Sequence, residues 1–257
     1  MKLLVKLGGT LLDSLESRDR LAAQIACARA RGHQVVVVHG GGKQMTRYLA
    51  ERGIESRFVG GLRVTTPETL DAVLKVFAGS VNHELVAALN RAGALAVGLS
   101  GIDALLAEAE QMDPELGAVG RVTASNPQIL DVLVKNGFVP SIACVAGDRQ
   151  GNIYNVNADQ MAVACASAFG ADQLVFLTDV DGVLDAAKQV RPILTAAESR
   201  ALIADGVATG GMQAKLNAAL AALEGGVGQV RIAPGSAEHV LDRILAGEPI
   251  GTRMVTV

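Results

Sequence analysis

Near its start the chain reads Leu3-Leu4-Val5-Lys6-Leu7-Gly8-Gly9-Thr10. An apolar run that ends in two glycines predicts a buried strand followed by a tight loop. Lys6 is the exception in this run, because burying an ammonium group without a partner costs free energy. From this stretch alone, two interpretations are equally good: Lys6 faces an anion at the mouth of a site, or it forms an internal salt bridge.

A second run, Val35-Val36-Val37-Val38, leads into the loop His39-Gly40-Gly41-Gly42. Four β-branched residues without polar alternation indicate a parallel strand that is buried on both faces. Apolar residues at helical spacing predict one helix between Ser14 and Arg31 and another over 43–52. This order predicts an α/β fold with an open, mainly parallel β-sheet sandwiched between helices. Ligands of such sheets bind beyond the carboxyl ends of the strands.

The remaining elements continue the same pattern. Helices are predicted over 67–92, 127–136, 195–205 and 212–224, and strands over 94–99, 138–145, 174–177, 229–232 and 252–257. Residues 105–123 lack clear periodicity and predict a hairpin-like excursion. A new αβ pattern begins at about residue 170. We therefore expect one domain of two lobes, an N-terminal lobe (1–169) and a C-terminal lobe (170–257).

Composition excludes several classes of protein. Hydrophobic residues make up 50% and charged residues 19% of the chain, which excludes disorder, and no uninterrupted apolar segment is long enough to span a membrane. A net charge of -3 and an aromatic content of 3% provide neither the positive field nor the stacking surfaces of a nucleic-acid-binding protein. We expect a soluble cytoplasmic protein without nucleic-acid or membrane partners.

The cysteines support a reducing compartment. Cys27, Cys144 and Cys165 lie far apart among alanines and valines, without the spacing of a metal site. They are expected to be small core residues of a cytoplasmic protein. No metal-binding residues are predicted.

The Gly40-Gly41-Gly42 loop can present backbone amides to an anion at the start of a helix. It does not match the Walker A motif, because Gln44 follows Lys43, and it does not match GxGxxG, because residue 45 is methionine. An esterase oxyanion loop would also require a GxSxG motif, and the candidate at 98–102 lacks the final glycine.

Other polar groups follow strands or open helices. Lys215 lies in the first turns of a helix that Thr209-Gly210-Gly211 opens, although most helical lysines are simply solvated. Asp179 and Asp181 follow a strand and either cap a loop or contact a nucleotide.

The segment Asn155-Val156-Asn157-Ala158-Asp159 carries three polar side chains where a helix begins, and capping explains one of them. Together with the lysines and the glycine loops, these groups describe a site for phosphoryl transfer. Such catalysis depends on positioning and charge neutralisation and needs no protein nucleophile.

These motifs resemble the amino acid kinase family over essentially the whole chain. The resemblance rests on the order and spacing of Lys6-Leu7-Gly8-Gly9, His39-Gly40-Gly41-Gly42, Gly61-Leu62-Arg63-Val64-Thr65, Asn155-Val156-Asn157-Ala158-Asp159, and Gly211-Met212 before Lys215. The chain departs from the family pattern at Thr66-Pro67, where many members carry an acidic residue. The acyl specificity is therefore less defined than the type of reaction.

The resemblance implies a role for each motif. Lys6 and Lys215 would neutralise the transferred phosphoryl group, and Asp159 would hold both lysines. The amides of Gly8, Gly9, Gly41 and Gly42 would bind the phosphoryl group and the acylated substrate, whose α-carboxylate end would contact Arg63 and Asn155. The nucleotide pocket would comprise Asp179, Val180, Asp181, Gly182, Val183, Leu184, Val207, Ala208 and Thr209.

The resemblance also implies the reaction. ATP, with Mg²⁺ bound through the nucleotide, would phosphorylate the γ-carboxylate of N-acetyl-L-glutamate in L-arginine biosynthesis. A homodimer is expected, with the helix from Pro67 as a candidate dimer surface. Arginine-inhibited members carry a helix before the first strand, so we expect insensitivity to arginine. Two alternatives stay open: a kinase of carrier-protein-linked aminoadipate or glutamate, and a non-catalytic sensor of amino acids or nucleotides.

Overall fold

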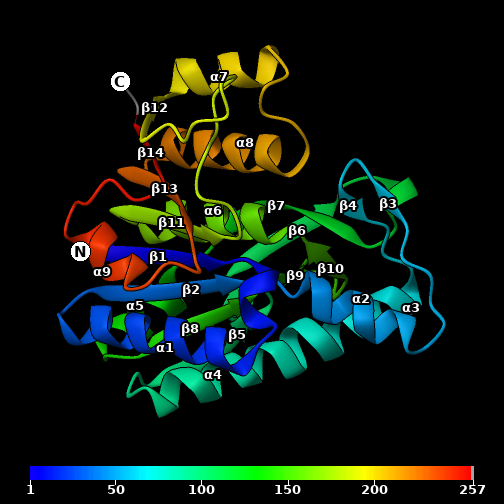
Figure 1. The fold of residues 1–257 in the computed structure, drawn as a ribbon. Coiled ribbons are helices and arrows are strands. Elements are labelled where there is room, and N and C mark those ends of the chain that lie inside the picture. The colour runs from blue at the N-terminus through cyan, green and yellow to red at the C-terminus, as the bar shows by residue number, and fades with distance from the viewer. Residues whose placement is uncertain (256–257) are drawn as a thin grey trace.

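The computed structural model describes residues 1–255 and contains a central eight-stranded sheet (Figure 1). Its strands, in spatial order, are β12 (Ile193–Thr195), β14 (Thr252–Val255), β13 (Gln229–Pro234), β11 (Gln173–Thr178), β1 (Lys2–Leu7), β2 (Gln34–His39), β8 (Val139–Ala143) and β5 (Ala96–Ser100). Neighbours run parallel except β13 and β14, which are antiparallel. The predicted open, mainly parallel sheet is confirmed, with the opening stretch of the chain near its middle.

Helices cover both faces of this sheet. They are α1 (Leu15–Ala30), α2 (Gly42–Ala50), α3 (Pro67–Val73), α4 (Asn82–Arg91), α5 (Gln128–Lys135), α6 (Ala158–Phe169), α7 (Ala196–Ala204), α8 (Gly210–Glu224) and α9 (Val240–Leu245). α1 packs on α4 and α9, whereas α6 packs on β1, β11 and α8. Short 3₁₀ turns occur at η1 (Gly9–Leu12), η3 (Asp103–Leu105) and η4 (Pro114–Leu116).

The alternation of side chains along β1 assigns its two faces. Lys2 contacts Asp131 of α5 and Lys6 contacts Asp159 of α6, so the even-numbered residues point toward these helices. Leu3, Val5 and Leu7 point to the opposite face, and all three are fully buried. The lysine in the apolar run therefore lies on the side of the sheet that α6 covers.

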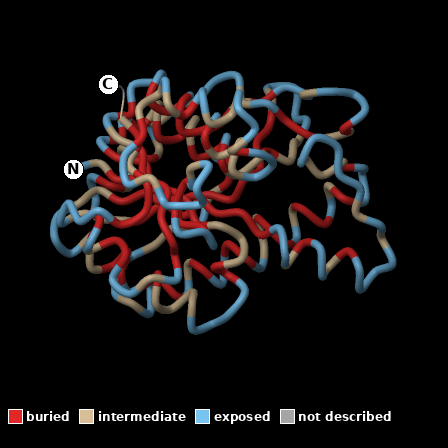
Figure 2. The backbone as a smooth tube through the Cα atoms, turned by 45° about the horizontal axis from the view of Figure 1, so that its top comes forward, coloured by how far each residue is buried: buried red, intermediate tan, exposed pale blue. Residues whose placement is uncertain are grey.

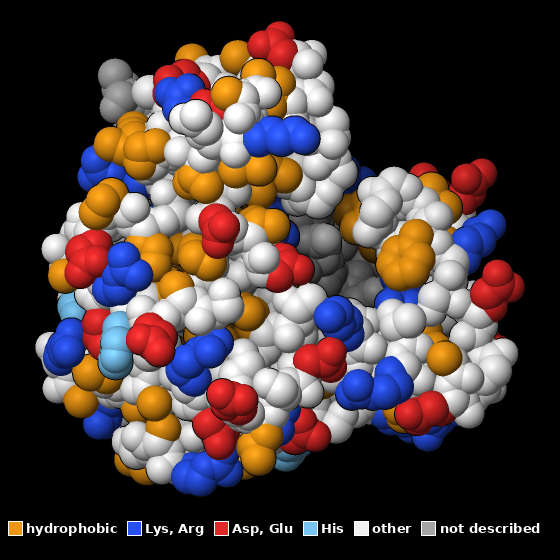
Figure 3. Space-filling model, viewed as in Figure 1, with side chains coloured by type: hydrophobic (Ala, Val, Ile, Leu, Met, Phe, Trp, Pro, Cys, Tyr) orange, Lys and Arg blue, Asp and Glu red, His pale blue; other side chains and the backbone are white. Residues whose placement is uncertain are grey.

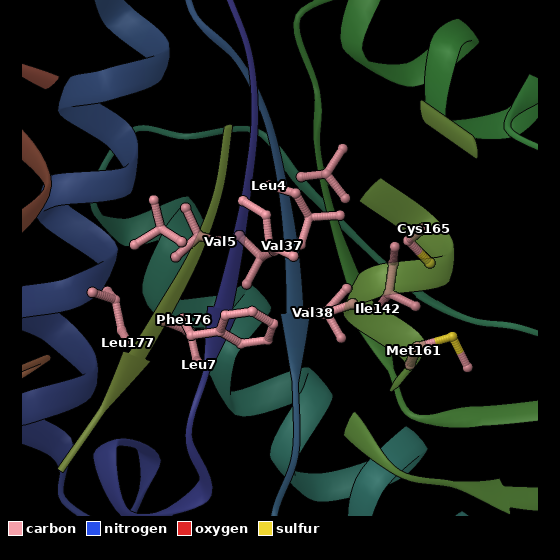
Figure 4. Packing of buried hydrophobic residues seen from close by; sticks show 14 of the residues in the cluster. Leu4, Val5, Leu7, Val37, Val38, Ile142, Met161, Cys165, Phe176 and Leu177 are labelled. Atoms are coloured by element: carbon pink, nitrogen blue, oxygen red, sulfur yellow. The ribbon is translucent and has the colours of Figure 1, made fainter. Parts of the chain in front are cut away.

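The core fills the space between the sheet and the helices. Figure 4 shows Val38 of β2 and Ile142 of β8 close to Met161 and Cys165 of α6. Figure 2 shows that buried backbone is concentrated in the middle of the molecule. The thiols of Cys144 and Cys165 are free and buried, and burial raises the pKa of each to about 12. Both are core residues, as predicted.

The helix expected over 67–92 is present but is not uniform. A π-helical segment, η2 (Leu74–Val81), joins α3 to α4. The helical stretch Pro67–Arg91 is long and apolar enough to cross a membrane, but half of its most apolar 18-residue segment is buried in the protein. This burial is typical of a core helix.

Residues 105–123 form the predicted hairpin, in which β6 (Ala107–Gln111) and β7 (Val119–Ser125) pair antiparallel. This hairpin joins β9 (Val145–Gly147) and β10 (Ile153–Val156) in a small closed sheet. The prediction of a single strand over 138–145 was wrong. The chain leaves the central sheet after Ala143, because the carbonyl of Cys144 accepts a hydrogen bond from Val156 of β10.

Other differences from the predicted elements are small. β3 (Phe58–Val59) and β4 (Leu62–Arg63) form a two-stranded projection, and α8 begins at Gly210 instead of residue 212. The end of the last predicted strand, 256–257, lies outside the described residues. β11 follows the expected lobe boundary directly and pairs with β1, so one sheet runs through both expected lobes.

Candidate active site

Lys6, Asp159 and Lys215 meet at the carboxyl end of β1. The Lys6 Nζ lies 2.6 Å from Asp159 Oδ1, and the Lys215 Nζ lies 3.2 Å from Asp159 Oδ2. The three side chains come from β1, α6 and α8, and those of Lys6 and Asp159 are at most 10% exposed. The two interpretations of Lys6 are therefore compatible, since it forms an internal ion pair at the edge where ligands bind.

The electrostatics of this cluster keep Asp159 ionised. Burial acts to raise the pKa of Asp159, but the charges of Lys6 and Lys215 outweigh it, and the pKa lies below its ordinary value. The amino terminus of α6 adds positive potential at the carboxylate. One carboxylate facing two ammonium groups leaves a local excess of one positive charge, which suits a bound anion.

Local hydrogen bonds place Asp159 in the first turn of α6. Asn157 is the N-cap, and its Oδ1 accepts from the amides of Asp159 at 2.9 Å and Gln160 at 3.2 Å. Asn157 is thus the one polar residue of its segment that capping explains. Asn155 instead donates from Nδ2 to Thr65 Oγ1 at 3.0 Å.

The two glycine loops after β1 and β2 lie against each other. A Cβ atom on Gly9 would lie 2.9 Å from the Gly42 nitrogen and 3.4 Å from the Gly41 nitrogen, so only glycine permits this approach. Within residues 1–255, the amides of Gly9, Gly41 and Gly42 donate to no protein acceptor. Gly8 differs, because its amide donates to the carbonyl of Leu177 at 3.0 Å. Three of the four predicted amide donors are therefore unpaired.

Arg63 lies beside the second glycine loop. It contacts Ser56 Oγ, and it donates from Nη2 to Thr46 Oγ1 at 2.8 Å and to the Gly42 carbonyl at 3.4 Å. Its guanidinium also covers the ring of Phe58 at 4.6 Å, and burial lowers the pKa of Arg63. These contacts hold the arginine next to Gly42, as a shared substrate site would require.

Thr65 connects Arg63 to Asn155. Its hydroxyl donates to the Arg63 carbonyl at 2.9 Å while it accepts from Asn155. The next two residues start α3: Thr66 Oγ1 accepts from the amide of Thr69 at 3.2 Å, and Pro67 occupies the first turn. The departure at Thr66-Pro67 therefore has a structural role as a helix start.

The predicted nucleotide residues lie on two segments. Asp179–Leu184 follow β11, where the Val183 amide donates to Thr252 Oγ1 at 2.8 Å and Asp179 accepts from Thr178. Val207–Thr209 precede α8, and Thr209 is the N-cap of the helix that carries Lys215. No hydrogen bond or ion pair joins the two segments among the described residues, so their common role stays a prediction.

The overall shape agrees with a site near this cluster. Figure 3 shows a hollow between the part of the molecule that carries α7 and α8 and the projection that carries β3 and β4. A separate open cavity of about 910 Å³ is lined by Thr65, Glu115, Asn152 and Tyr154 among others, but by none of the three charged residues of the cluster. Within residues 1–255, no group of histidine, cysteine and carboxylate side chains is arranged to hold a metal ion.

Sequence reasoning missed the role of His39 and Asn82. His39 is fully buried, its Nδ1 lies 2.8 Å from the Gly40 carbonyl, and Asn82 Nδ2 lies 2.8 Å from its Nε2. Asn82 is 43 positions away in the sequence, and only its helical register relative to β2 could have suggested the pair.

The burial of His39 predicts a pH effect on stability. Burial lowers the pKa of His39 from 6.5 to about 4, with the Gly40 hydrogen bond acting in the opposite direction. The unfolded chain therefore binds the proton first, and the free energy of unfolding should fall by about 2 kcal/mol between pH 7 and pH 5 from this group. Urea unfolding at both pH values measures the fall. In the His39→Gln variant, the free energy of unfolding should fall less between the two pH values, because the contribution of His39 is absent. The same fall as in the wild-type protein would contradict the prediction.

The chain is similar to known proteins of one family. Residues 1–234 match the model of the amino acid kinase family. The chain is 79% identical to an acetylglutamate kinase of Solibacter usitatus, over the full length of both proteins. It is 48% identical to an acetylglutamate kinase of Acidobacterium capsulatum, over 94% of each chain.

A solved structure has the same fold. The N-acetylglutamate synthase of Neisseria gonorrhoeae, complexed with coenzyme A and N-acetyl-glutamate, superposes with a TM-score of 0.89 at 26% identity. The match covers all of this chain but only 59% of the synthase. The family model and the relatives agree, and the lysine-aspartate cluster is consistent with them. The chain belongs to the amino acid kinase family.

Proposed function

We propose that the protein transfers the γ-phosphoryl group of ATP to the γ-carboxylate of N-acetyl-L-glutamate, in L-arginine biosynthesis. The product is the acyl phosphate N-acetyl-L-glutamyl 5-phosphate. The observation that carries this proposal is the cluster of Lys6, Asp159 and Lys215, in which two ammonium groups share one buried carboxylate. The two relatives described above are both acetylglutamate kinases, which supports the choice of acceptor.

In this mechanism the substrate carboxylate oxygen attacks the γ-phosphorus, the bond from phosphorus to the bridging oxygen breaks, and ADP leaves. Lys6 and Lys215 neutralise charge on the phosphoryl oxygens and on the leaving group. Asp159 keeps both ammonium groups in place and remains ionised. The protein supplies no nucleophile and need not move a proton, because the acceptor is already a carboxylate.

The acyl substrate would lie along the second glycine loop. The amides of Gly9, Gly41 and Gly42 are unpaired within residues 1–255 and are available to oxygen atoms of the phosphoryl group or of the acceptor. Gly8 would contribute through the shape of its loop, since its amide is already bonded. Arg63 would bind the α-carboxylate with its planar fork, and Asn155, oriented by Thr65, would bind the same end of the substrate.

The nucleotide would bind in the C-terminal lobe, between Asp179–Leu184 and Val207–Thr209. Mg²⁺ would be held by the nucleotide and water and would neutralise phosphate charge, since Asp159 is already paired with two lysines. We further propose a cytoplasmic homodimer. Light scattering on the purified protein measures its mass, and a monomer at micromolar concentration would refute the dimer.

Replacing Arg63 by alanine is expected to raise the KM for N-acetyl-L-glutamate by about 10- to 100-fold, because a charge-assisted contact to the substrate is lost. The KM for ATP should change little, since Arg63 lies beside α2 and not in the C-terminal lobe. Steady-state kinetics with each substrate varied in turn measures both constants. The matched control is Arg52→Ala, because Arg52 is exposed in the turn that follows α2. An equal rise in both constants would contradict the assignment.

The substrate itself is tested by a side-by-side assay. ADP release is measured with N-acetyl-L-glutamate, glutamate, aspartate and N-acetylaspartate, and the proposal expects the highest kcat/KM for N-acetyl-L-glutamate. No preference for this substrate would refute the acceptor and would favour a carrier-linked acyl group. No turnover with any acceptor, with ATP still bound, would favour a sensor.

A further inference from the structure

The Gly40-Gly41 peptide group is held by a buried histidine. His39 Nδ1 lies 2.8 Å from the Gly40 carbonyl oxygen, which can only accept a hydrogen bond. Nδ1 therefore carries the proton of the imidazole ring. The remaining ring nitrogen, Nε2, is an acceptor and faces Asn82 Nδ2 at 2.8 Å. His39 and Asn82 are 0% and 3% exposed, so water cannot replace either contact.

Asn82 is fixed in the orientation that selects this tautomer. Its Nδ2 group also donates to the carbonyl of Ser141 on β8 at 2.9 Å, so both of its N–H groups are used. Its Oδ1 atom lies where a Cβ on Gly98 of β5 would overlap it. Rotating the carboxamide by half a turn would put Oδ1 against the Ser141 carbonyl and the imidazole lone pair, two acceptors. Asn82 can thus only donate to Nε2.

The π-helical segment brings a second contact to the same loop. A Cβ on Gly41 would lie 2.8 Å from Phe77 Cδ1 and 3.3 Å from Val81 Cγ2, so both side chains rest against the Gly41 backbone. Relative to Phe77, Val81 is four residues and Asn82 five residues further along the chain. A π turn places residues at this spacing on one face of the helix. The long helix therefore contacts the glycine loop through two side chains and, by way of His39, through Asn82.

The consequence follows from the geometry of the peptide group. The Gly40 carbonyl and the Gly41 amide belong to one planar trans unit, in which C=O and N–H point in opposite directions. A hydrogen bond that fixes the Gly40 oxygen therefore also fixes where the Gly41 N–H points. That N–H is one of the three unpaired amides of the site in residues 1–255.

We propose that Asn82 is a positioning residue for phosphoryl transfer: by holding His39 in the Nδ1–H tautomer, it aims the Gly41 amide at the reacting oxygen atoms. This inference rests on the proposed function for its chemistry. Both side chains are buried, and their effect passes through one peptide group.

The first test replaces the donor with an acceptor of the same shape, Asn82→Asp. A carboxylate in this place sets an acceptor against the Ser141 carbonyl and draws a second proton onto the imidazole ring, so the ring is no longer held as a neutral Nδ1–H donor and the peptide group can turn. Loss of a donor of this kind outright costs about 100- to 1,000-fold in kcat, so misorienting it is expected to lower kcat by about 10- to 100-fold. The KM for ATP should stay within about twofold.

The matched control is Asn90→Asp, the same change on the same helix. Asn90 is exposed, and its Oδ1 accepts from the Ala96 amide at 2.8 Å, a contact that aspartate also makes. This variant should keep the wild-type kcat. Thermal unfolding of both variants shows whether the Asn82→Asp protein is folded at the assay temperature. A folded Asn82→Asp protein with wild-type kcat would overturn the proposal.

A second measurement needs no folded variant at position 82. Long-range ¹H–¹⁵N NMR of the ¹⁵N-histidine-labelled wild-type protein reports the tautomer of each ring, and the signal of His39 is assigned by its absence in His39→Gln. The Nδ1–H tautomer is expected at pH 7, and the Nε2–H tautomer would overturn the proposal. If the wild-type protein showed no kinase turnover, the proposed function would fail while the NMR result would still stand.

Discussion

Replacing Lys6 by alanine is expected to lower kcat by about 100- to 1,000-fold, with a much smaller change in the KM for either substrate. The reason is that the charge on the phosphoryl oxygens is redistributed as the group moves, so the Lys6 ammonium interacts more strongly with the transition state than with bound ATP. The Lys215→Ala variant should behave in the same way. Steady-state ADP release under saturating N-acetyl-L-glutamate and ATP measures the effect.

Lys75 provides the control for this prediction. It is exposed and forms an ion pair with Asp71 four residues away on the same helical segment, so Lys75→Ala removes a lysine without touching the cluster. Its kcat should match the wild-type value. A Lys6→Ala defect confined to KM, with kcat retained, would contradict the role assigned to Lys6 and would leave it as a ground-state contact.

The Asp159→Asn variant is expected to lose about 3 to 5 kcal/mol of stability as well as most of its activity. Removing this carboxylate leaves the ammonium groups of Lys6 and Lys215 partly buried, close together and without a counter-ion. Urea unfolding at pH 7 measures the loss of stability, and kinetics on the folded protein at low temperature measures the activity.

The pH dependence of the same variant provides an independent check. The folded-state pKa of Asp159 is depressed, so its ion pairs contribute stability above about pH 4, and this contribution is lost as the pH falls through the folded-state pKa. Asp159→Asn should lack that part of the acid loss.

The matched control is Asp131→Asn, since the Asp131 pair with Lys2 is about one-third exposed and should contribute no more than about 1 kcal/mol. Equal losses of stability in Asp159→Asn and Asp131→Asn would contradict the assignment of Asp159 as the buried counter-ion.

Most of the central sheet could be predicted because buried parallel strands have a strong local signature. The run Val35-Val36-Val37-Val38 has no polar alternation, and only a strand covered on both faces satisfies it. The path after Ala143 could not be predicted in this way. The apolar residues continue through Val145, and the change of sheet depends on a hydrogen bond between Cys144 and the distant Val156.

The sequence by itself determined the types of chemical group and their places at strand ends: two lysines, an aspartate, an arginine and glycine loops. Local patterns carry this information because strand, loop and helix each impose their own spacing on the residues. Only the tertiary structure decided which groups meet, because pairing depends on neighbours that are distant in sequence. The partner of Lys6 comes from α6, and the Gly8 amide donates to β11, whereas the Gly41 amide is unpaired within residues 1–255. Lys6, ambiguous in its own strand, becomes one of two lysines on a shared carboxylate because the sheet and α6 bring that carboxylate to 2.6 Å.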